Sequence, residues 1–423
     1  MTHMKILFVS PYPPSRIRVR GYGFVQNLRC EHEITILTQV SSRTEWHDIQ
    51  LLRQQGFEVV AVPESQNLAL WRSGLALLSE LPLQVAYARS KRFLQQARLL
   101  CLKREFDVIH VEHLRGIASM DLLSEEYPLV WDAVDCISDL WRQTVQYGPG
   151  MLVRMIALLE YKRTEMYERK LQEKQAHIIT TSDADRAALL ALSQPAVPYS
   201  EAPHIDVIPG GVDLEYFVPT NQQYRPYNIV FSGKMSYHAN VAAALYLYRK
   251  VMPLIWIEQP DATLTIVGSS PPHSIQSLQI DRRVEVTGYV EDIRPYVCRA
   301  HVMLSPMLYS VGIQNKVLET MALGTPAVIS THSAHSMNVQ PGQDVFVADS
   351  SHAFADAALF LMGQKTLRDS VSHRARQYVE RYHHWPTLTR QLLQTYQRAI
   401  SCDDRKTTAP APEHSSYKNM HSS

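Results

Sequence analysis

The sequence predicts an α/β protein with two domains, each built on a parallel sheet covered by helices. Short apolar runs alternate with longer helical patterns from residue 5 to residue 400. The same alternation restarts at Asn228, after a segment rich in Pro, Asn and Gln at residues 213–227. A chain of 423 residues also exceeds one ordinary hydrophobic core. We therefore expect two Rossmann-like domains that face each other across a cleft.

Apolar runs of strand length are expected to form the sheet of the first domain. They are residues 5–10, 33–38, 58–62, 107–111, 129–132, 177–182 and 205–209. Prolines follow the first run at positions 11, 13 and 14, and a helix is expected to begin near Gly21. A long helical pattern covers residues 150–174.

The second half contains further strand-length runs, and several end on glycine. The runs are residues 228–233, 263–268, 284–288 and 301–305. Ligands of open α/β sheets bind at the carboxyl ends of strands. Gly233 and Gly268 are therefore expected at the rim of a binding pocket.

Residues 312–329 read as loop, helix, glycine and buried strand. A loop that donates backbone N–H groups at a helix N-terminus can bind a diphosphate. Glu319 lies about two turns into this helix, and its carboxylate needs hydroxyls or a cation as partner. A nucleotide ribose offers two adjacent hydroxyls. The alternative is a capped helix with an exposed Glu.

Composition narrows the classes of function. The formal net charge of +1 argues against nucleic acid as a partner. Five cysteines without a C-x-x-C pair predict a reducing cytosol rather than a disulfide framework. The N-terminus lacks the apolar segment of a signal peptide, and no run has the length of a membrane span. The tail after Cys402 is expected to be disordered.

Several motifs occur in an order that resembles retaining glycosyltransferases of family 4. They are Ile208-Pro209-Gly210-Gly211-Val212-Asp213, Val230-Phe231-Ser232-Gly233-Lys234, Leu264-Thr265-Ile266-Val267-Gly268 and Gly312-Ile313-Gln314-Asn315-Lys316-Val317-Leu318-Glu319. The last motif looks like a subgroup tied to exopolysaccharide assembly. The resemblance covers residues 5–400 and implies the GT-B fold, with a C-terminal helix that crosses back to the first domain.

The resemblance also implies domain limits. These are an acceptor-side domain at 1–218, a hinge at 219–227 and a nucleotide-sugar domain at 228–380. A crossover helix at 381–402 and a tail at 403–423 complete the chain.

The resemblance implies roles for particular residues. Glu319 would hold the ribose, and the loop from Gly312 through Ile313, Gln314 and Asn315 to Lys316 would lie along the diphosphate. Lys234 would neutralise the departing phosphate, which is electrostatic catalysis. Two further catalytic residues, His113 and Asp135, would face the donor sugar and the acceptor hydroxyl. An N-cap or packing role is the alternative for both.

This sequence departs from the family at three positions. The first Glu of the family's pair is Val311 here, which puts sugar recognition in doubt. The usual phosphate-binding Lys falls on Ala239, and we hypothesise that Lys316 substitutes for it. The second His of a frequent D-x-x-H-x-H motif falls on Glu112, with His113 next to it.

Other features have two interpretations each. Gly21-Tyr22-Gly23 half-matches a dinucleotide fingerprint but lacks the third Gly. In the resemblance this loop faces the cleft, with Arg18, Arg20 and Gly21 near acceptor or diphosphate; a solvated loop is the alternative. His pairs at 110/113 and 332/335 lack a third ligand, so we expect no metal.

Residues 89–104 are basic and amphipathic, which suits either peripheral membrane contact or an ordinary sheet-covering helix.

We therefore expect a cytoplasmic enzyme, at the inner face of the membrane if its acceptor is lipid-linked. It would be a hexosyltransferase-type enzyme of class EC 2.4. It would move a sugar from a nucleotide diphosphate-sugar to a glycan or lipid-linked acceptor with retention of configuration. No separate cofactor is expected. The alternatives are a nucleotide-sugar epimerase on the same fold and a catalytically impaired scaffold protein.

Overall fold

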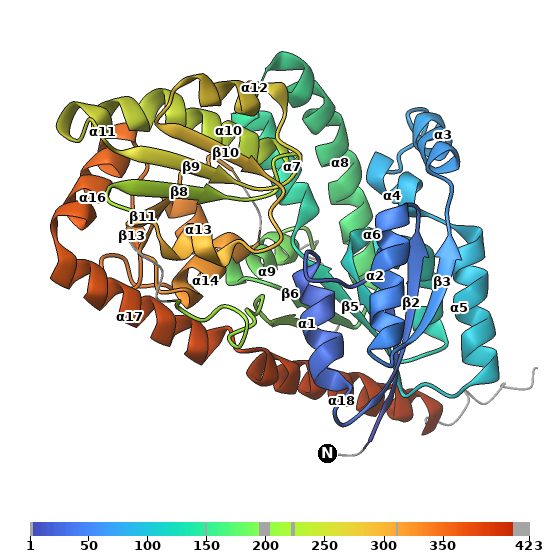
Figure 1. Cartoon of the computed structure of the whole chain (residues 1–423). Coiled ribbons are helices and arrows are strands. Elements are labelled where there is room, and N and C mark those ends of the chain that lie inside the picture. The colour runs from blue at the N-terminus through green and yellow to red at the C-terminus, as the bar shows by residue number, and fades with distance from the viewer. Residues whose placement is uncertain (1–2, 149, 194–203, 221–224, 310–311, 409–423) are drawn as a thin grey trace, which may run out of the picture.

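Two lobes lie side by side in the computed structural model (Figure 1), which describes residues 3–148, 150–193, 204–220, 225–309 and 312–408. The N-terminal lobe contains a parallel sheet of seven strands in the order β3-β2-β1-β4-β5-β6-β7. These strands are β1 (Lys5–Ser10), β2 (Glu33–Val40), β3 (Glu58–Pro63), β4 (Val108–Glu112), β5 (Leu129–Val134), β6 (His177–Thr180) and β7 (His204–Val207).

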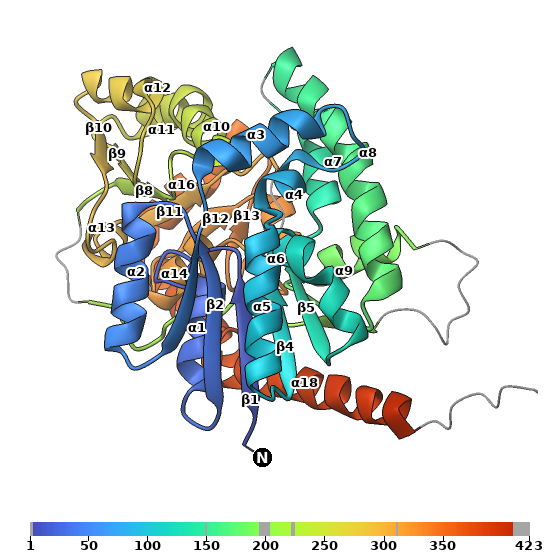
Figure 2. The same cartoon turned by 90° about the vertical axis from the view of Figure 1, so that its right-hand side faces the viewer.

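Helices follow most strands of this lobe and cover both faces of its sheet (Figure 2). They are α1 (Val19–Leu28), α2 (Arg43–Gln54), α3 (Gln66–Ala76), α4 (Leu83–Ala88), α5 (Lys91–Lys103), α6 (His113–Met120), α7 (Ile137–Tyr147), α8 (Met151–Lys174) and α9 (Asp183–Leu190). A short 3₁₀ helix, Asp121–Glu125, follows α6.

The C-terminal lobe repeats the plan with six parallel strands in the order β10-β9-β8-β11-β12-β13. The strands are β8 (Asn228–Ser232), β9 (Thr263–Val267), β10 (Val284–Gly288), β11 (Val302–Ser305), β12 (Ala327–Ile329) and β13 (Phe346–Val347). The helices are α10 (His238–Tyr246), α11 (Met252–Glu258), α12 (His273–Gln276), α13 (Arg294–Cys298), α14 (Asn315–Ala322), α15 (Thr331–His335), α16 (Ser351–Gly363), α17 (Lys365–Tyr382) and α18 (Trp385–Thr408).

This architecture confirms the predicted fold class. Each expected strand is present within one or two residues of its expected limits, because a buried parallel strand is an almost continuous apolar run. The two-residue strand β13 was not predicted, since Phe346–Val347 is too short to stand out as a run. The predicted limits of the domains and the hinge stay predictions. Residues 221–224 and 409–423 lie outside the described parts of the chain.

Helix α5 carries the basic segment at residues 89–104. Ser90 caps its N-terminus by accepting a hydrogen bond from Phe93 N–H at 3.2 Å. Phe93, Ala97 and Leu100 are buried on one face and pack in the core of the lobe. The helix therefore covers the sheet, and membrane contact through it stays a prediction. Within the described residues, no helix combines the length and apolar character needed to cross a bilayer.

The last helix, α18, returns from the C-terminal lobe and runs beneath the N-terminal lobe (Figures 1 and 2). Its Leu392 and Tyr396 are fully buried in the same apolar cluster as Phe8 of β1. Trp385 is the first residue of α18, and its indole packs against Gly23 and Gly211. A Cβ atom on Gly23 would lie 2.2 Å from the indole, and one on Gly211 would lie 2.5 Å from it. The predicted crossing of the C-terminal helix is thus present, and it reaches Thr408 rather than 402.

Candidate functional site

The carboxyl ends of β8 and β9 meet at two glycines, as predicted. Gly233 and Gly268 have φ angles of 150° and 152°, and a Cβ atom on Gly268 would lie 1.9 Å from the carbonyl oxygen of Gly233. Only glycine permits this approach of the two backbones. Lys234 follows directly, and its exposed side chain lies at the predicted rim.

A buried lysine lies beneath this rim. Lys316 Nζ donates to Asn240 Oδ1 at 2.6 Å and lies 4.6 Å from the centroid of the Phe231 ring. Asn240 Nδ2 in turn donates to the carbonyl oxygen of Lys234 at 2.9 Å. The Lys316 ammonium thus lies at the start of α10, beside the Ala239 position where the family usually has its lysine.

Asn240 was not among the predicted site residues. An Asn inside the first turn of a helix is ordinarily a capping candidate, and the Lys316 partner of Asn240 lies 76 residues away.

Glu319 lies one turn beyond Lys316 on α14 and is half-buried. Burial lowers the pKa of Lys316 to about 7 and raises the pKa of Glu319 to about 7, while each charge opposes the shift of the other. Burial removes water from the Lys316 ammonium and the Glu319 carboxylate. A diphosphate would stabilise the charged ammonium in place of that water, and ribose hydroxyls would stabilise the charged carboxylate. Such a pair is typical of a binding site waiting for a polar ligand.

The loop before α14 brings the two lobes into contact. Gly312 has a φ of 65°, and a Cβ atom on it would lie 2.0 Å from Asp135 Oδ1, after β5 in the other lobe. Ile313 and Gln314 follow and are half-buried, while Asn315 is exposed at the start of α14. Val311, the position of the missing family Glu, lies outside the described residues.

Asp135 is half-buried and accepts a hydrogen bond from Thr181 Oγ1 at 3.2 Å. Burial raises its pKa to about 7, and the neighbouring carboxylate of Asp185 adds to the rise. Asp185 also accepts a bond from Cys136 N–H at 3.0 Å and so fixes the backbone that carries Asp135. The predicted acceptor-side carboxylate therefore lies against the predicted diphosphate loop.

His113 is the first residue of α6, with a φ of 67°. Its Nδ1 accepts from the backbone N–H of Arg115 at 3.2 Å, which leaves the ring proton on Nε2. Burial lowers the pKa of His113 to about 3, so the imidazole is neutral at pH 7. The side chain is thus a neutral hydrogen-bond donor at the end of β4.

Arg20 is not in the predicted position beside the cleft. Arg20 is 9% exposed, and its guanidinium makes two bonds to Asp132, at 2.7 and 3.0 Å. It also donates to the carbonyl oxygen of Ile208 at 2.9 Å. Asp132 is fully buried and would be an isolated charge without this partner, so Arg20 is held in the core.

The other two residues of that predicted loop have separate surroundings. Arg18 is half-buried and pairs with Glu45 at 2.6 Å. Gly21 is buried in α1, and its N–H donates to the carboxylate of Glu112. Burial raises the pKa of Glu112 to about 7, and Ser10 Oγ donates to it at 2.7 Å. Glu112 therefore supports the strand ends from within the core.

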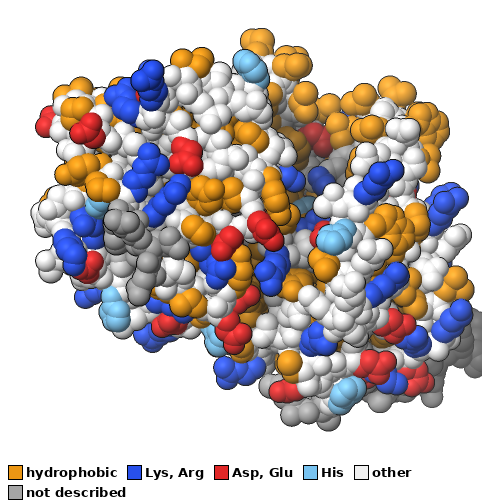
Figure 3. Space-filling model, in the orientation of Figure 1, with side chains coloured by type: hydrophobic (Ala, Val, Ile, Leu, Met, Phe, Trp, Pro, Cys, Tyr) orange, Lys and Arg blue, Asp and Glu red, His pale blue; other side chains and the backbone are white. Residues whose placement is uncertain are grey.

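A cavity of about 440 Å³ lies between the lobes, lined by Tyr147 and Arg154 of one and Met307 and His332 of the other. Figure 3 shows the surface hollowed between the lobes. Met307 Sδ lies 3.2 Å from Lys316 Nζ, so this cavity borders the buried lysine. Within the described residues, no group of three or more His, Cys, Asp or Glu side chains could hold a metal ion.

Replacing Gly312 by Ala tests the contact between the lobes. We expect Gly312→Ala to lower the free energy of unfolding by about 1–3 kcal/mol and to weaken nucleotide binding, because the methyl group displaces Asp135. Gly342→Ala is the matched control, since Gly342 has a φ of 77° and nothing within 4 Å. Thermal unfolding and calorimetry would measure both variants. If Gly312→Ala and Gly342→Ala changed nucleotide binding equally, the contact of Gly312 with Asp135 would have no role in binding.

Comparison with solved structures identifies the fold of this chain. HepE from Anabaena, solved with UDP and glucose, superposes with a TM-score of 0.66 at 14% identity, covering 93% of this chain and all of that one. Sucrose-phosphate synthase from Thermosynechococcus elongatus gives a TM-score of 0.67 at 15% identity, covering 95% and 100%. A putative UDP-N-acetylglucosamine 2-epimerase from Listeria monocytogenes gives 0.56 at 10% identity, covering 97% and 99%. The fold is therefore GT-B.

Sequence comparison identifies a family and a relative to which parts of this chain are similar. Residues 226–364, which include Gly233, Gly268, Lys316 and Glu319, match the model of a family described as glycosyl transferases group 1. D-inositol 3-phosphate glycosyltransferase from Paenarthrobacter aurescens is 24% identical over 341 residues, covering 73% of this chain and 76% of that protein. The similarity to this family therefore lies in residues 226–364 of the C-terminal lobe.

Proposed function

We propose that this protein transfers a hexose from a nucleoside diphosphate-sugar to a glycan or lipid-linked acceptor with retention of configuration. The strongest support is that the family match and the buried charged pair fall in the same part of the chain. The family match at residues 226–364 contains the buried Lys316 and Glu319, whose perturbed pKa values call for a polar ligand. The named neighbours solved with UDP, glucose or UDP-glucose favour UDP-glucose as the first donor to test.

In this proposal the C-terminal lobe holds the donor. The diphosphate lies at the start of α14, where Lys316 and Lys234 neutralise its charge together with backbone N–H groups. Glu319 accepts hydrogen bonds from the ribose hydroxyls. Because Asn240 and Phe231 hold the Lys316 ammonium in place, its charge needs no rearrangement as the diphosphate departs.

The N-terminal lobe presents the acceptor from the other side of the cleft. The neutral His113 donates from Nε2 to a donor-sugar hydroxyl, and Asp135 orients the attacking hydroxyl. The bond from the anomeric carbon to the phosphate oxygen breaks as the acceptor oxygen bonds to the same face. The acceptor proton passes to the departing phosphate oxygen, so no further catalytic base is required.

Glu319→Ala is expected to weaken nucleotide binding by about 1–3 kcal/mol, because it removes charge-assisted hydrogen bonds to the ribose. Isothermal calorimetry with UDP and with GDP would measure the change and identify the base. Glu380→Ala, a helical Glu on the surface of α17, is the control. Unchanged affinity in Glu319→Ala would refute the ribose role.

Two alternatives make different predictions in the same assays. A nucleotide-sugar epimerase would convert the donor without releasing nucleotide, and the Listeria neighbour shows that GT-B folds include proteins with that name. A scaffold protein would neither release nucleotide nor convert the sugar. Nucleotide release from a panel of donors, with and without cell-extracted acceptors, separates these from a transferase.

A further inference from the structure

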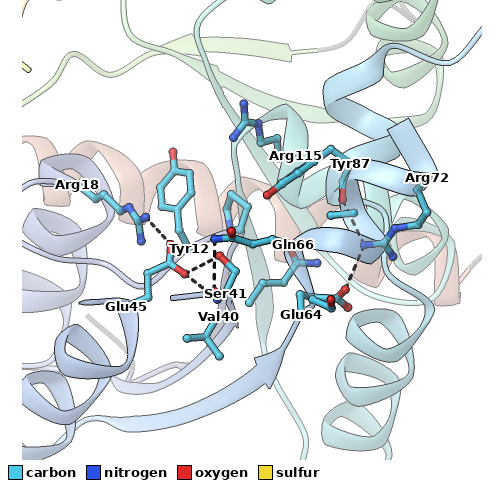
Figure 4. Close-up of a pocket in the computed structure, with 14 residues that line it drawn as sticks. Tyr12, Arg18, Val40, Ser41, Glu45, Glu64, Gln66, Arg72, Tyr87 and Arg115 are labelled. Carbon is cyan, nitrogen blue, oxygen red and sulfur yellow. Dashed lines mark hydrogen bonds and ion pairs between the residues drawn. The ribbon is translucent and has the colours of Figure 1, made fainter. Parts of the chain in front are cut away.

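A second pocket lies wholly within the N-terminal lobe, at the carboxyl ends of β1, β2 and β3 (Figure 4). Its cavity of about 140 Å³ is close to that of engineered cavities that hold benzene, so one six-membered ring or a phosphate group fits. Polar side chains line it, including Ser41, Gln66 and three arginines from separate elements. Arg18 precedes α1, Arg72 is on α3 and Arg115 is on α6.

Two of the three guanidinium groups are neutralised by carboxylates. Arg18 pairs with Glu45 at 2.6 Å, and Arg72 pairs with Glu64 at 3.1 Å. The bond from Arg18 helps hold the pKa of Glu45 below its usual value, against the effect of burial. The two ion pairs thus leave one of the three guanidinium groups without a carboxylate.

Arg115 is the guanidinium without a balancing group. The Nε atoms of Arg115 and Arg72 are both buried without a hydrogen-bond partner among the described residues, but Arg72 has its ion pair with Glu64 and no ion pair to Arg115 is present there. Figure 4 shows the ion pairs on Arg18 and Arg72 and none on Arg115. A buried donor without a partner costs desolvation free energy, so the pocket lacks acceptor groups, and only at Arg115 does it also lack a negative charge.

The pocket also adjoins the proposed transfer site. The backbone N–H of Arg115 donates to His113 Nδ1, and Tyr12 in the pocket wall lies 6.5 Å from the His113 ring. A group bound at Arg115 would thus extend from the same acceptor whose hydroxyl reaches the cleft.

We propose that this pocket binds an anionic group of the acceptor, a phosphate or a carboxylate, through the guanidinium of Arg115. The inference rests on the proposed function, because it names the acceptor of that transfer. The planar fork of Arg115 matches both anions, and the neighbouring hydroxyl and amide side chains match sugar hydroxyls. The acceptor is then a negatively charged molecule, and neutral glycans are poor acceptors.

The same anion could belong to a free sugar phosphate or to a lipid phosphate. Helix α3 lines the pocket through Gln66, Ala69 and Arg72, and it also carries Leu70, Trp71 and Leu75, which are exposed to solvent outside the pocket lining. The apolar chain of a lipid phosphate would need an exposed apolar surface such as this one, whereas a free sugar phosphate would not. Trp71 is 62% exposed and is therefore the residue that distinguishes the two sources.

Inorganic phosphate is the first probe, titrated by calorimetry into the full chain whose nucleotide site is saturated with UDP or GDP. We expect Arg115→Gln to weaken phosphate binding about 10-fold to 100-fold, the effect of losing charge-assisted bonds. Arg115→Lys should retain part of the affinity, and Arg98→Gln, at a surface ion pair, should retain all of it. No phosphate binding, or equal binding by Arg115→Gln, would overturn the inference.

Acceptor panels supply the second measurement, with each phosphorylated compound paired to its neutral counterpart. Transfer to the phosphorylated member should be faster, and Arg115→Gln should reduce that preference about 10-fold or more. Equal use of the neutral member would overturn the inference. If Trp71→Ser reduces transfer to a polyprenyl phosphate in micelles, the acceptor is a lipid phosphate. If Trp71→Ser leaves transfer to a sugar phosphate unchanged, the acceptor is a free sugar phosphate.

Nucleotide affinity is measured in the same variants. If the wild-type chain bound neither UDP nor GDP, the proposed function itself would be refuted. Retained nucleotide binding with no preference for anions would refute only the acceptor pocket.

Discussion

Arg20→Ala is expected to lower the free energy of unfolding by about 3–5 kcal/mol, the effect of removing one partner of a buried ion pair. The fully buried Asp132 would lose both of its guanidinium bonds. Urea denaturation, followed by tryptophan fluorescence to which the buried Trp131 contributes, would measure the change.

Two further variants test the cause of that loss. Arg142→Ala removes an ion pair whose Arg side chain is 60% exposed, and we expect about 0–1 kcal/mol there. Arg20→Met combined with Asp132→Leu should recover most of the stability, because no unpaired charge remains. If Arg20→Ala were as mild as Arg142→Ala, the buried pair would not stabilise the lobe.

Lys316→Met is expected to reduce kcat/KM for transfer about 100-fold to 1,000-fold, the usual effect of removing one preorganised charge from a transition state. Lys234→Met should have a smaller effect. The Lys234 side chain is exposed and must lose conformational freedom to reach the phosphate. Steady-state rates with a fixed donor would measure both variants, and thermal unfolding would confirm that they fold.

Asn240 offers a control for the position of the charge. Asn240→Ala keeps the lysine but removes its bond at 2.6 Å, so we expect a loss between those of the two lysine variants. A rate within threefold of wild type for Lys316→Met would remove Lys316 from the proposed mechanism.

The sequence predicted the strands well because a buried parallel strand depends on its own residues. The glycines at the ends of β8 and β9 were predicted for the same reason, since the turn after a strand is local. Glu319 was expected on no obvious solvent face, and it is half-buried in the structure.

Long-range pairings were not predictable in this way. Arg20 was expected beside the cleft. Its burial against Asp132 could not be foreseen, because the two residues are 112 positions apart in the sequence. Gly312 was recognised as a loop glycine, but its contact with Asp135 depends on how the two lobes meet. The charge balance around Arg115 likewise depends on groups far apart in the sequence, among them Glu45 of α2, Glu64 after β3 and Arg72 of α3.

The two passages of the chain between the lobes are bonded to each other. Val212 N–H donates to the carbonyl oxygen of His383 at 2.9 Å, and His383 Nδ1 lies 2.7 Å from the carbonyl oxygen of Gly210. Recombination that exchanges donor lobes between related genes must therefore cut twice, near residues 212 and 384. A chimera joined at one point would separate α18 from the lobe whose core it completes, and it would expose Leu392 and Tyr396 to water.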